Sequence, residues 1–234
     1  MNLLAFDTAT PATVAAVARD PDHVVTRRHD PAPGERPAHA TALLSLVDEA
    51  LAEAGLDLAD VERLGVGTGP GSFTGLRIGL ATARGLTQAL DLPLAPVSSL
   101  DALAAGASAE VGPDRRVLAV IDAGRGEGFA LAVRGDRRLG EPAALGPEAL
   151  SQAVVALVAD SGQNAGTPLA VGGGAVRFQA QLRAAGAAVP PDESPLHRLD
   201  GRQLCRLAAA AETADRHAVL PHYARPPDAT PHPR

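Results

Sequence analysis

The stretch Gly67–Gly79, GTGPGSFTGLRIG, constrains the fold more than any other part of the chain. It follows a short apolar run, Leu64–Val66, which is typical of a buried strand. It leads into Leu76–Leu90, which is typical of a helix. The glycines and the proline between them indicate a tight turn with backbone angles that glycine adopts most easily. The sequence therefore predicts a strand, a tight turn and a helix in direct succession.

The turn has two interpretations. Ser72 and Thr74 carry hydroxyl groups at positions suited to capping the start of the helix. A glycine-rich loop at a helix N-terminus can also bind an anion. Glycine-rich loops are weak motifs, so we prefer a capped turn that only joins the strand to the helix.

Small residues recur along the helix that follows. Gly75, Gly79 and Ala83 are four residues apart and so share one face. Glycine inside a helix costs about 1 kcal/mol relative to alanine, so a packing interaction should offset this cost. Close approach of another helix is the usual reason, and that helix could belong to the same fold or to another subunit.

The rest of the chain alternates between strand-like and helix-like segments. Strands are expected at Asn2–Phe6, Ala12–Val17, His23–Asp30, Leu94–Val97, Val117–Ile121, Gly128–Val133 and Pro168–Val171, and helices at His39–Ala54, Ser98–Ala107, Pro147–Ala159, Ala175–Ala185 and Gly201–Ala214. The polar segment Gly106–Arg115 indicates a boundary between two lobes. We expect an N-terminal lobe over 1–108, a smaller lobe over 109–195, a segment over 196–225 that packs back on the first lobe, and a loose tail over 226–234.

Two acidic turns follow strands. Asp7 and Thr8 either hold metal and phosphate or only form hydrogen bonds with the backbone of their own turn. Ala9 stands where phosphate-binding loops usually carry glycine. Asp122 follows a later strand in the same way, which indicates a weak internal duplication. The Gly172–Gly174 run reads most simply as another tight turn.

Histidine and lysine usage limits the chemistry. No two of the seven histidines are four residues apart, so no pair shares a helix face as a metal-binding pair would, and we expect no metal site. His39, at a helix start, is expected to be a capping or surface residue. The chain contains no lysine, which excludes a Walker-A lysine, a lysine Schiff base and a lysine general base.

Charge and composition indicate compartment and partners. A net charge of −6 makes the chain a poor candidate for binding RNA through its own field. No run of 18 apolar residues and no signal sequence are visible, so we expect a cytoplasmic protein without a membrane segment. The single cysteine, Cys205, fits a reducing compartment and a small core residue.

Several stretches together resemble one known family. GPGSFTGLRIGLATARGL, at Gly69–Leu86, is similar to the signature of the TsaB (YeaZ) family of tRNA threonylcarbamoyladenosine biosynthesis proteins. Further similar stretches are Leu3–Thr10, Ala54–Gly75, Leu92–Ala104, Val117–Val133 and Pro221–Ala229. The resemblance covers nearly the whole chain.

The resemblance implies an α/β fold of two ribonuclease-H-like lobes with mixed sheets flanked by helices, as in actin, Hsp70 and sugar kinases. It implies a non-catalytic subunit that binds TsaD and, with the ATPase TsaE, supports threonylcarbamoyl transfer to position 37 of ANN-decoding tRNAs. This chain lacks the HxxxH histidine pair of TsaD. It is then expected to bind no cofactor itself, although the complex uses ATP, and to meet tRNA through the complex.

Two sets of residues are candidates for a site. An apolar patch on two neighbouring helices would bind TsaD, or a second copy of the chain; its expected residues are Leu43, Leu44, Val47, Gly75, Leu76, Gly79, Leu80 and Ala83. A vestigial nucleotide cleft would use Asp7, Thr8, Asp122, Gly172 and Gly173. The alternative functions are a small ATP-dependent phosphotransferase that uses this cleft and, more weakly, a glycoprotease-like peptidase.

Overall fold

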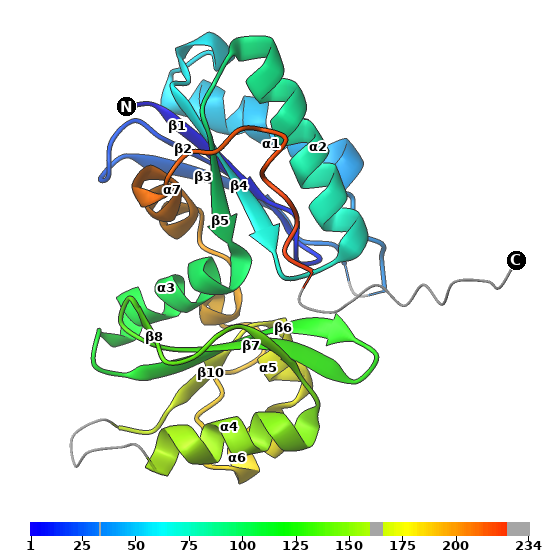
Figure 1. Ribbon diagram of the computed structural model, residues 1–234, viewed down its shortest axis with the longest axis vertical. Helices are drawn as coiled ribbons and strands as arrows, with labels where there is room; N and C mark the ends of the chain where they lie inside the picture. The colour runs from blue at the N-terminus through cyan, green and yellow to red at the C-terminus, as the bar shows by residue number, and fades with distance from the viewer. Residues whose placement is uncertain (33, 160–165, 224–234) are drawn as a thin grey trace, which may run out of the picture.

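The computed structural model describes residues 1–32, 34–159 and 166–223. The chain forms two lobes, and each lobe contains one five-stranded mixed sheet flanked by helices (Figure 1). The predicted fold class, an α/β protein with two such lobes, is confirmed. No helix among the described residues is long and apolar enough to cross a membrane.

The first sheet has the strand order β3-β2-β1-β4-β5. Its strands are β1 (Leu3–Asp7), β2 (Thr13–Ala18), β3 (Val24–His29), β4 (Arg63–Gly69) and β5 (Leu94–Ser98). β1, β2 and β3 form an antiparallel meander, while β4 and β5 run parallel to β1. Parallel strands need crossover connections, and α1 (His39–Ala54) and α2 (Phe73–Leu90) provide them.

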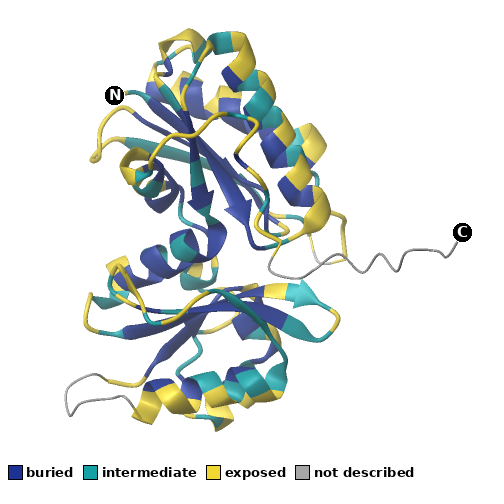
Figure 2. Ribbon diagram, in the orientation of Figure 1, coloured by how far each residue is buried: buried dark blue, intermediate teal, exposed yellow. Residues whose placement is uncertain are grey.

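Alternating residues of β1 face two different layers. Leu4 and Phe6 pack with α1 and α2 in one core, whereas Leu3 and Ala5 pack with α7 (Gly201–Ala210) in another. Strand residues are buried in both layers, and exposed positions lie on the outward sides of the helices (Figure 2). The first sheet is therefore covered on both faces.

The second sheet has the order β10-β6-β7-β8, with β9 also paired to β7. Its strands are β6 (Arg116–Gly124), β7 (Glu127–Arg134), β8 (Arg137–Arg138), β9 (Ala143–Leu145) and β10 (Leu169–Val171). The helices α4 (Pro147–Ala159), α5 (Gly173–Arg177) and α6 (Gln179–Ala184) lie on one side of it (Figure 1). Short 3-10 turns lie at Leu58–Asp60 and Pro195–His197.

Helix α3 (Ser99–Val111) joins the two lobes. It packs on β6 and β7 of the second sheet and on α7 of the first lobe, and its leucines belong to a core shared by both lobes. A boundary at residue 108 would cut this helix near its end, so the lobe limits stay a prediction.

Four predicted helices differ from the structure. Helix α2 begins at Phe73 rather than Leu76, and α3 ends at Val111 rather than Ala107. The segment expected as one helix over Ala175–Ala185 is two short helices, because the chain bends at Phe178 to bury that ring in the second-lobe core. The last helix ends at Ala210 rather than Ala214, because Ala214 N donates instead to Leu94 O at the edge of β5. The tail predicted over 226–234 lies outside the described residues.

The segment after α7 crosses back over the first lobe. The Arg84 guanidinium donates to Arg216 O and Val219 O, and His222 N donates to Thr68 O. These bonds hold the segment along β5 and α2 and bring Tyr223 to the start of α2.

Candidate partner-binding surface

The turn between β4 and α2 is a capped turn. Ser72 is the N-cap residue of α2, and its Oγ accepts a hydrogen bond from Gly75 N at 3.3 Å. Ser72 N donates to Ala9 O at 2.7 Å, which ties the turn to the β1–β2 connection. Thr74 lies inside the helix rather than at its cap. These bonds agree with the capped-turn interpretation of the glycine-rich stretch.

The small-residue face of α2 packs inside its own lobe. A Cβ atom on Gly75 would lie 1.9 Å from Thr8 O, and one on Gly79 would lie 2.4 Å from Thr8 Oγ1. Thr8 Oγ1 also donates to Gly75 O at 2.8 Å. The β1–β2 turn is the closest group to both glycines. Helix α1 of the same lobe also approaches, because a Cβ on Gly75 would lie 3.2 Å from Nε2 of His39, the first residue of α1.

The predicted interface residues are mostly not on the surface. Seven of the eight are buried within the chain: Leu43, Val47, Gly75, Leu76, Gly79, Leu80 and Ala83. Only Leu44 is well exposed, at 54%. The helical period places the other seven on the inward faces of α1 and α2, where they build the core under the sheet. A partner surface on these helices must consist of other residues.

An exposed cluster stands at the start of α2. The Arg77 guanidinium carbon lies 3.8 Å from the centre of the Phe73 ring. The Phe73 and Tyr223 rings are 5.4 Å apart, and Arg77 Nε approaches the Tyr223 hydroxyl at 3.5 Å. Phe73 is 51% exposed and Tyr223 is 42% exposed. We call these three residues the aromatic–arginine cluster; Leu44 lies on the adjacent helix α1.

Sequence reasoning missed this cluster. Arg77 and Tyr223 are 146 residues apart in the sequence. The path of the C-terminal segment brings them together. A signal was present in the composition, because the chain has only four phenylalanines and one tyrosine. Phe73 directly follows the helix cap and is exposed.

Asp7 is sealed in the interior. It is 0% exposed, its Oδ1 accepts from Ala9 N at 2.7 Å, and its Oδ2 accepts from Ser99 Oγ at 2.5 Å. A Cβ on Gly67 would lie 1.9 Å from the same Oδ2. Burial raises the pKa of the Asp7 carboxyl above its ordinary value, although the bonds from Ser99 and Ala9 oppose this shift.

The residues predicted for a nucleotide cleft do not share an open site. Thr8 is 1% exposed and lies under α2, beside the buried Asp7. Asp122 is exposed and pairs with Arg177. Gly172 is buried, with its N–H bonded to His197 Nδ1, and Gly173 is exposed. The two members from the first lobe offer no surface to a ligand in this structure.

His39 is buried rather than capping or on the surface. It begins α1, is 3% exposed, and its Nδ1 lies 2.8 Å from Thr13 Oγ1. Desolvation by burial, and to a lesser extent the nearby His29, lowers the pKa of His39. Within the described residues, no group of three or more His, Cys, Asp or Glu side chains could hold a metal ion.

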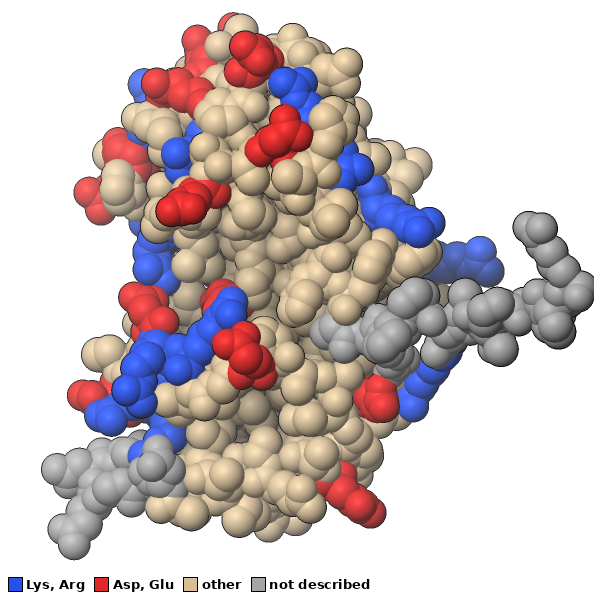
Figure 3. Space-filling model, in the orientation of Figure 1, with Lys and Arg blue, Asp and Glu red and all other residues tan. Residues whose placement is uncertain are grey.

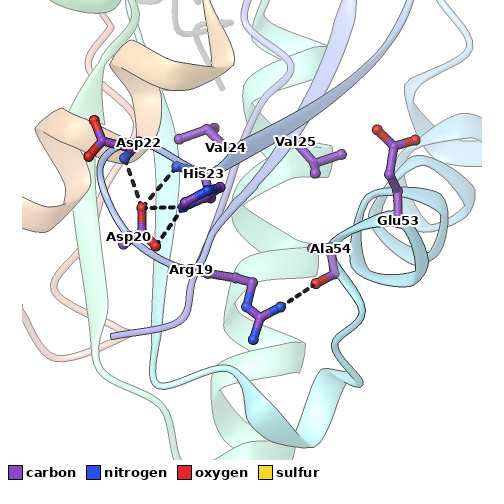
Figure 4. Close-up of a pocket in the computed structure, with 8 residues that line it drawn as sticks. All are labelled: Arg19, Asp20, Asp22, His23, Val24, Val25, Glu53 and Ala54. Carbon is purple, nitrogen blue, oxygen red and sulfur yellow. Dashed lines mark hydrogen bonds and ion pairs between the residues drawn. The ribbon is translucent and has the colours of Figure 1, made fainter.

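A surface depression of about 630 Å³ lies between the β2–β3 turn and the end of α1 (Figure 4). Asp20 turns its carboxylate toward its own turn, where it accepts from the backbone N–H groups of Asp22 and His23. The His23 ring is also 2.8 Å from Asp20 Oδ2, and this hydrogen bond lowers the pKa of the Asp20 carboxyl. Of the other charged groups here, Arg19 donates to the backbone carbonyl of Ala54 and Glu53 forms an ion pair with Arg27, so these side chains are not directed at a common point.

These features define a class of protein: a two-lobed α/β protein whose first-lobe aspartate is sealed, with an exposed aromatic cluster formed by helix α2 and the C-terminal segment. A family model described as "TsaD: tRNA N6-adenosine threonylcarbamoyltransferase" matches residues 35–185. An uncharacterised protein of Mycobacterium tuberculosis is 36% identical over 98% of this chain and 94% of its own length. The chain belongs to the TsaB (YeaZ) family.

Further relatives support this assignment. The tRNA threonylcarbamoyladenosine biosynthesis protein TsaB of Escherichia coli is 42% identical over 54% of this chain. The match spans about half of that protein, 52% of its length. Among solved structures, YeaZ from Pseudomonas aeruginosa has a TM-score of 0.74 and 29% identity, covering 95% of this chain and 99% of that one.

Proposed function

We propose that this chain is a non-catalytic partner subunit of the complex that forms N6-threonylcarbamoyladenosine at position 37 of ANN-decoding tRNAs. In this role it binds and supports a TsaD-like transferase, together with a TsaE-like protein. Its membership of the TsaB family supports the proposal, because curated relatives carry the name of this biosynthesis. The setting would be the cytoplasm.

The observation that carries the proposal is the aromatic–arginine cluster. The chain has five aromatic residues, and three of them, Phe6, Phe129 and Phe178, are buried. The other two, Phe73 and Tyr223, are stacked together on the surface beside Arg77. Tyrosine and arginine are enriched among residues that dominate binding energy at protein interfaces. The proposed docking surface is therefore this cluster with Leu44, and a homodimer would use the same surface when the partner is absent.

The phosphotransferase alternative has less support. It requires Asp7 to act on a metal or phosphate, and the Asp7 carboxylate is buried between Ser99 and Gly67. ATP would be used by the complex rather than bound by this chain. No observation favours the peptidase alternative.

The charge distribution supports an indirect contact with tRNA. The net charge of the chain is −6, and Figure 3 shows both carboxylates and arginines on the face in view. Affinity for RNA comes largely from phosphate contacts with basic side chains. The transferase would accordingly hold the tRNA.

Calorimetry with the purified TsaD-like protein of the same organism tests the proposal. Phe73→Ala should weaken binding by about 30-fold, because removing a dominant interface residue costs about 2 kcal/mol or more. Val155→Ala, an exposed apolar residue on α4, is the matched control and should bind like the wild type. Equal binding by Phe73→Ala would exclude this surface. Micromolar binding of Mg-ATP without a partner would instead support the phosphotransferase.

A further inference from the structure

A second cavity lies on the opposite face of the first sheet from α1 and α2. It has a volume of about 410 Å³ and is enclosed by β1, the β2–β3 turn and α7. Figure 1 shows α7 across this face, on the side where the chain begins. The cavity is therefore separate from the aromatic–arginine cluster, and a ligand there would not compete for the proposed partner surface.

The floor of the cavity is apolar, and the polar side chains around it include two arginines and Asp20. Leu3, Ala18 and Cys205 line the floor, with exposed fractions of 2%, 8% and 3%. Arg202 and Arg206 line the rim and are exposed. Pockets of a few hundred cubic ångströms with apolar walls and a few polar groups are the usual form of small-molecule sites.

The charge at the rim is not fully compensated. Arg206 donates to Asp136 at 2.9 Å, but Arg202 donates to a neutral group, Pro21 O, at 2.9 Å. Among the described residues, no ion pair joins Arg202 to a carboxylate. The carboxylate of Asp20, which also lines the cavity, is engaged by its own turn (Figure 4). An arginine with free donors beside an apolar floor suits a carboxylate on an aliphatic chain.

We propose that this cavity binds a small aliphatic carboxylate, of the size of a medium-chain fatty acid. The aliphatic chain lies on Leu3, Ala18 and Cys205, and the carboxylate pairs with the Arg202 guanidinium. The apolar floor sets the affinity through chain length, and Arg202 sets the preference for an acid over an alcohol.

Calorimetric titration of the whole chain with hexanoate, octanoate and decanoate tests the apolar part. Affinity should rise about fourfold with each added methylene, since each buried methylene adds a similar favourable transfer free energy. Ala209→Met places a larger side chain at the cavity from an exposed position and should abolish binding. Ala210→Met, at the next position, which is exposed and outside the cavity lining, should bind like the wild type.

The polar part is tested with Arg202→Gln. It should weaken decanoate binding at least tenfold and leave decanol binding unchanged. Arg183→Gln is the matched control, because Arg183 also donates to a backbone carbonyl, Val189 O, but lies on α6. Equal loss for acid and alcohol, or no loss for either, would overturn the assignment of the carboxylate to Arg202.

Cys205 provides a second readout, because it is the only cysteine and lines the cavity. Bound decanoate should slow modification of Cys205 by a small uncharged thiol reagent in the wild type and not in Ala209→Met. No saturable binding at millimolar decanoate, or binding without protection of Cys205, would overturn the proposal.

Discussion

The first strand of each lobe carries an aspartate at or near its end, Asp7 in β1 and Asp122 in β6, and each aspartate accepts a hydrogen bond from the backbone N–H two residues later. In the first lobe, Ala9 N donates to Asp7 Oδ1 at 2.7 Å. In the second lobe, Gly124 N donates to Asp122 Oδ1 at 2.8 Å. Short polar side chains stabilise turns in this way, so both turns follow from local sequence.

The surroundings of the two aspartates differ completely. Asp7 is covered by Ser99 at the start of α3 and faces Gly67 on β4, and it has no exposed surface. Asp122 is exposed and forms an ion pair with Arg177 at 2.8 Å. The comparison teaches that the chain segments packed over a turn, rather than the turn itself, decide whether its carboxylate can meet a ligand.

An added methyl group beside the sealed Asp7 carboxylate should strongly destabilise the protein. Gly67→Ala would place a Cβ 1.9 Å from Asp7 Oδ2 and 2.5 Å from Asp7 Cγ. Strand β4 and the buried carboxylate would both have to move, so we expect a loss of more than about 4 kcal/mol in the free energy of unfolding. Urea denaturation measures it.

The matched change in the second lobe is Gly173→Ala. A Cβ there meets no atom within 4 Å, so the free energy of unfolding should change by less than about 0.5 kcal/mol. Similar losses for the two variants would contradict the contrast between Gly67, which lies against a buried carboxylate, and Gly173, which begins α5 in open space.

Asp7→Ala, which removes the sealed carboxylate, should lower the free energy of unfolding less than Gly67→Ala does. Asp7→Ala leaves Ser99 Oγ and Ala9 N without their partner in a buried position. Leaving buried polar groups unpaired costs about 1–3 kcal/mol each, so we expect a loss of about 2–4 kcal/mol in unfolding free energy. Retention of wild-type stability would mean that water replaces the carboxylate and that the turn is open.

The sequence predicted the local structure of the turns better than the distant segments that pack over them. The strand, the tight turn and the helix around Gly67–Gly79 were identified from glycine, proline and an apolar run, and Ser72 is the cap. These features depend on neighbours within a few residues. The burial of Asp7 depends on Ser99, which is 92 residues away, and no local pattern reports that contact.

The candidate site shows the same limit. Small residues at four-residue spacing correctly indicated a close approach to α2, but the closest group is Thr8 in a turn, and His39 at the start of helix α1 lies farther away. The apolar stripe of α1 was found, yet an apolar stripe marks the inward face of a helix in a globular lobe. Residues for a partner lie on the outward face, where periodicity gives no signal.

Asp7→Asn should gain stability relative to wild type as the pH rises. Because burial raises the pKa of Asp7, the folded protein holds this proton more tightly than the unfolded chain does. Wild-type stability from this group is therefore lost as the pH rises from the ordinary value of 3.8 through the raised value. Asparagine keeps the shape without the charge, so its stability relative to wild type should increase over that range.

Urea denaturation of both proteins from about pH 4 to about pH 8 measures this difference. Asp122→Asn is the control, since it changes the same atoms in the exposed turn. A difference between Asp7→Asn and wild type that stays constant with pH would show that Asp7 has the same pKa in the folded and unfolded chains.

The smallest effect is expected at the open turn. Arg177→Gln removes the ion pair with Asp122, whose two side chains are 42% and 41% exposed. Exposed ion pairs contribute about 0–1 kcal/mol, because water and salt screen them. The change in unfolding free energy should therefore stay below about 1 kcal/mol and shrink further in high salt. A larger loss that salt does not reduce would mean that Asp122 is held in a desolvated setting like that of Asp7, and the two turns would then be alike.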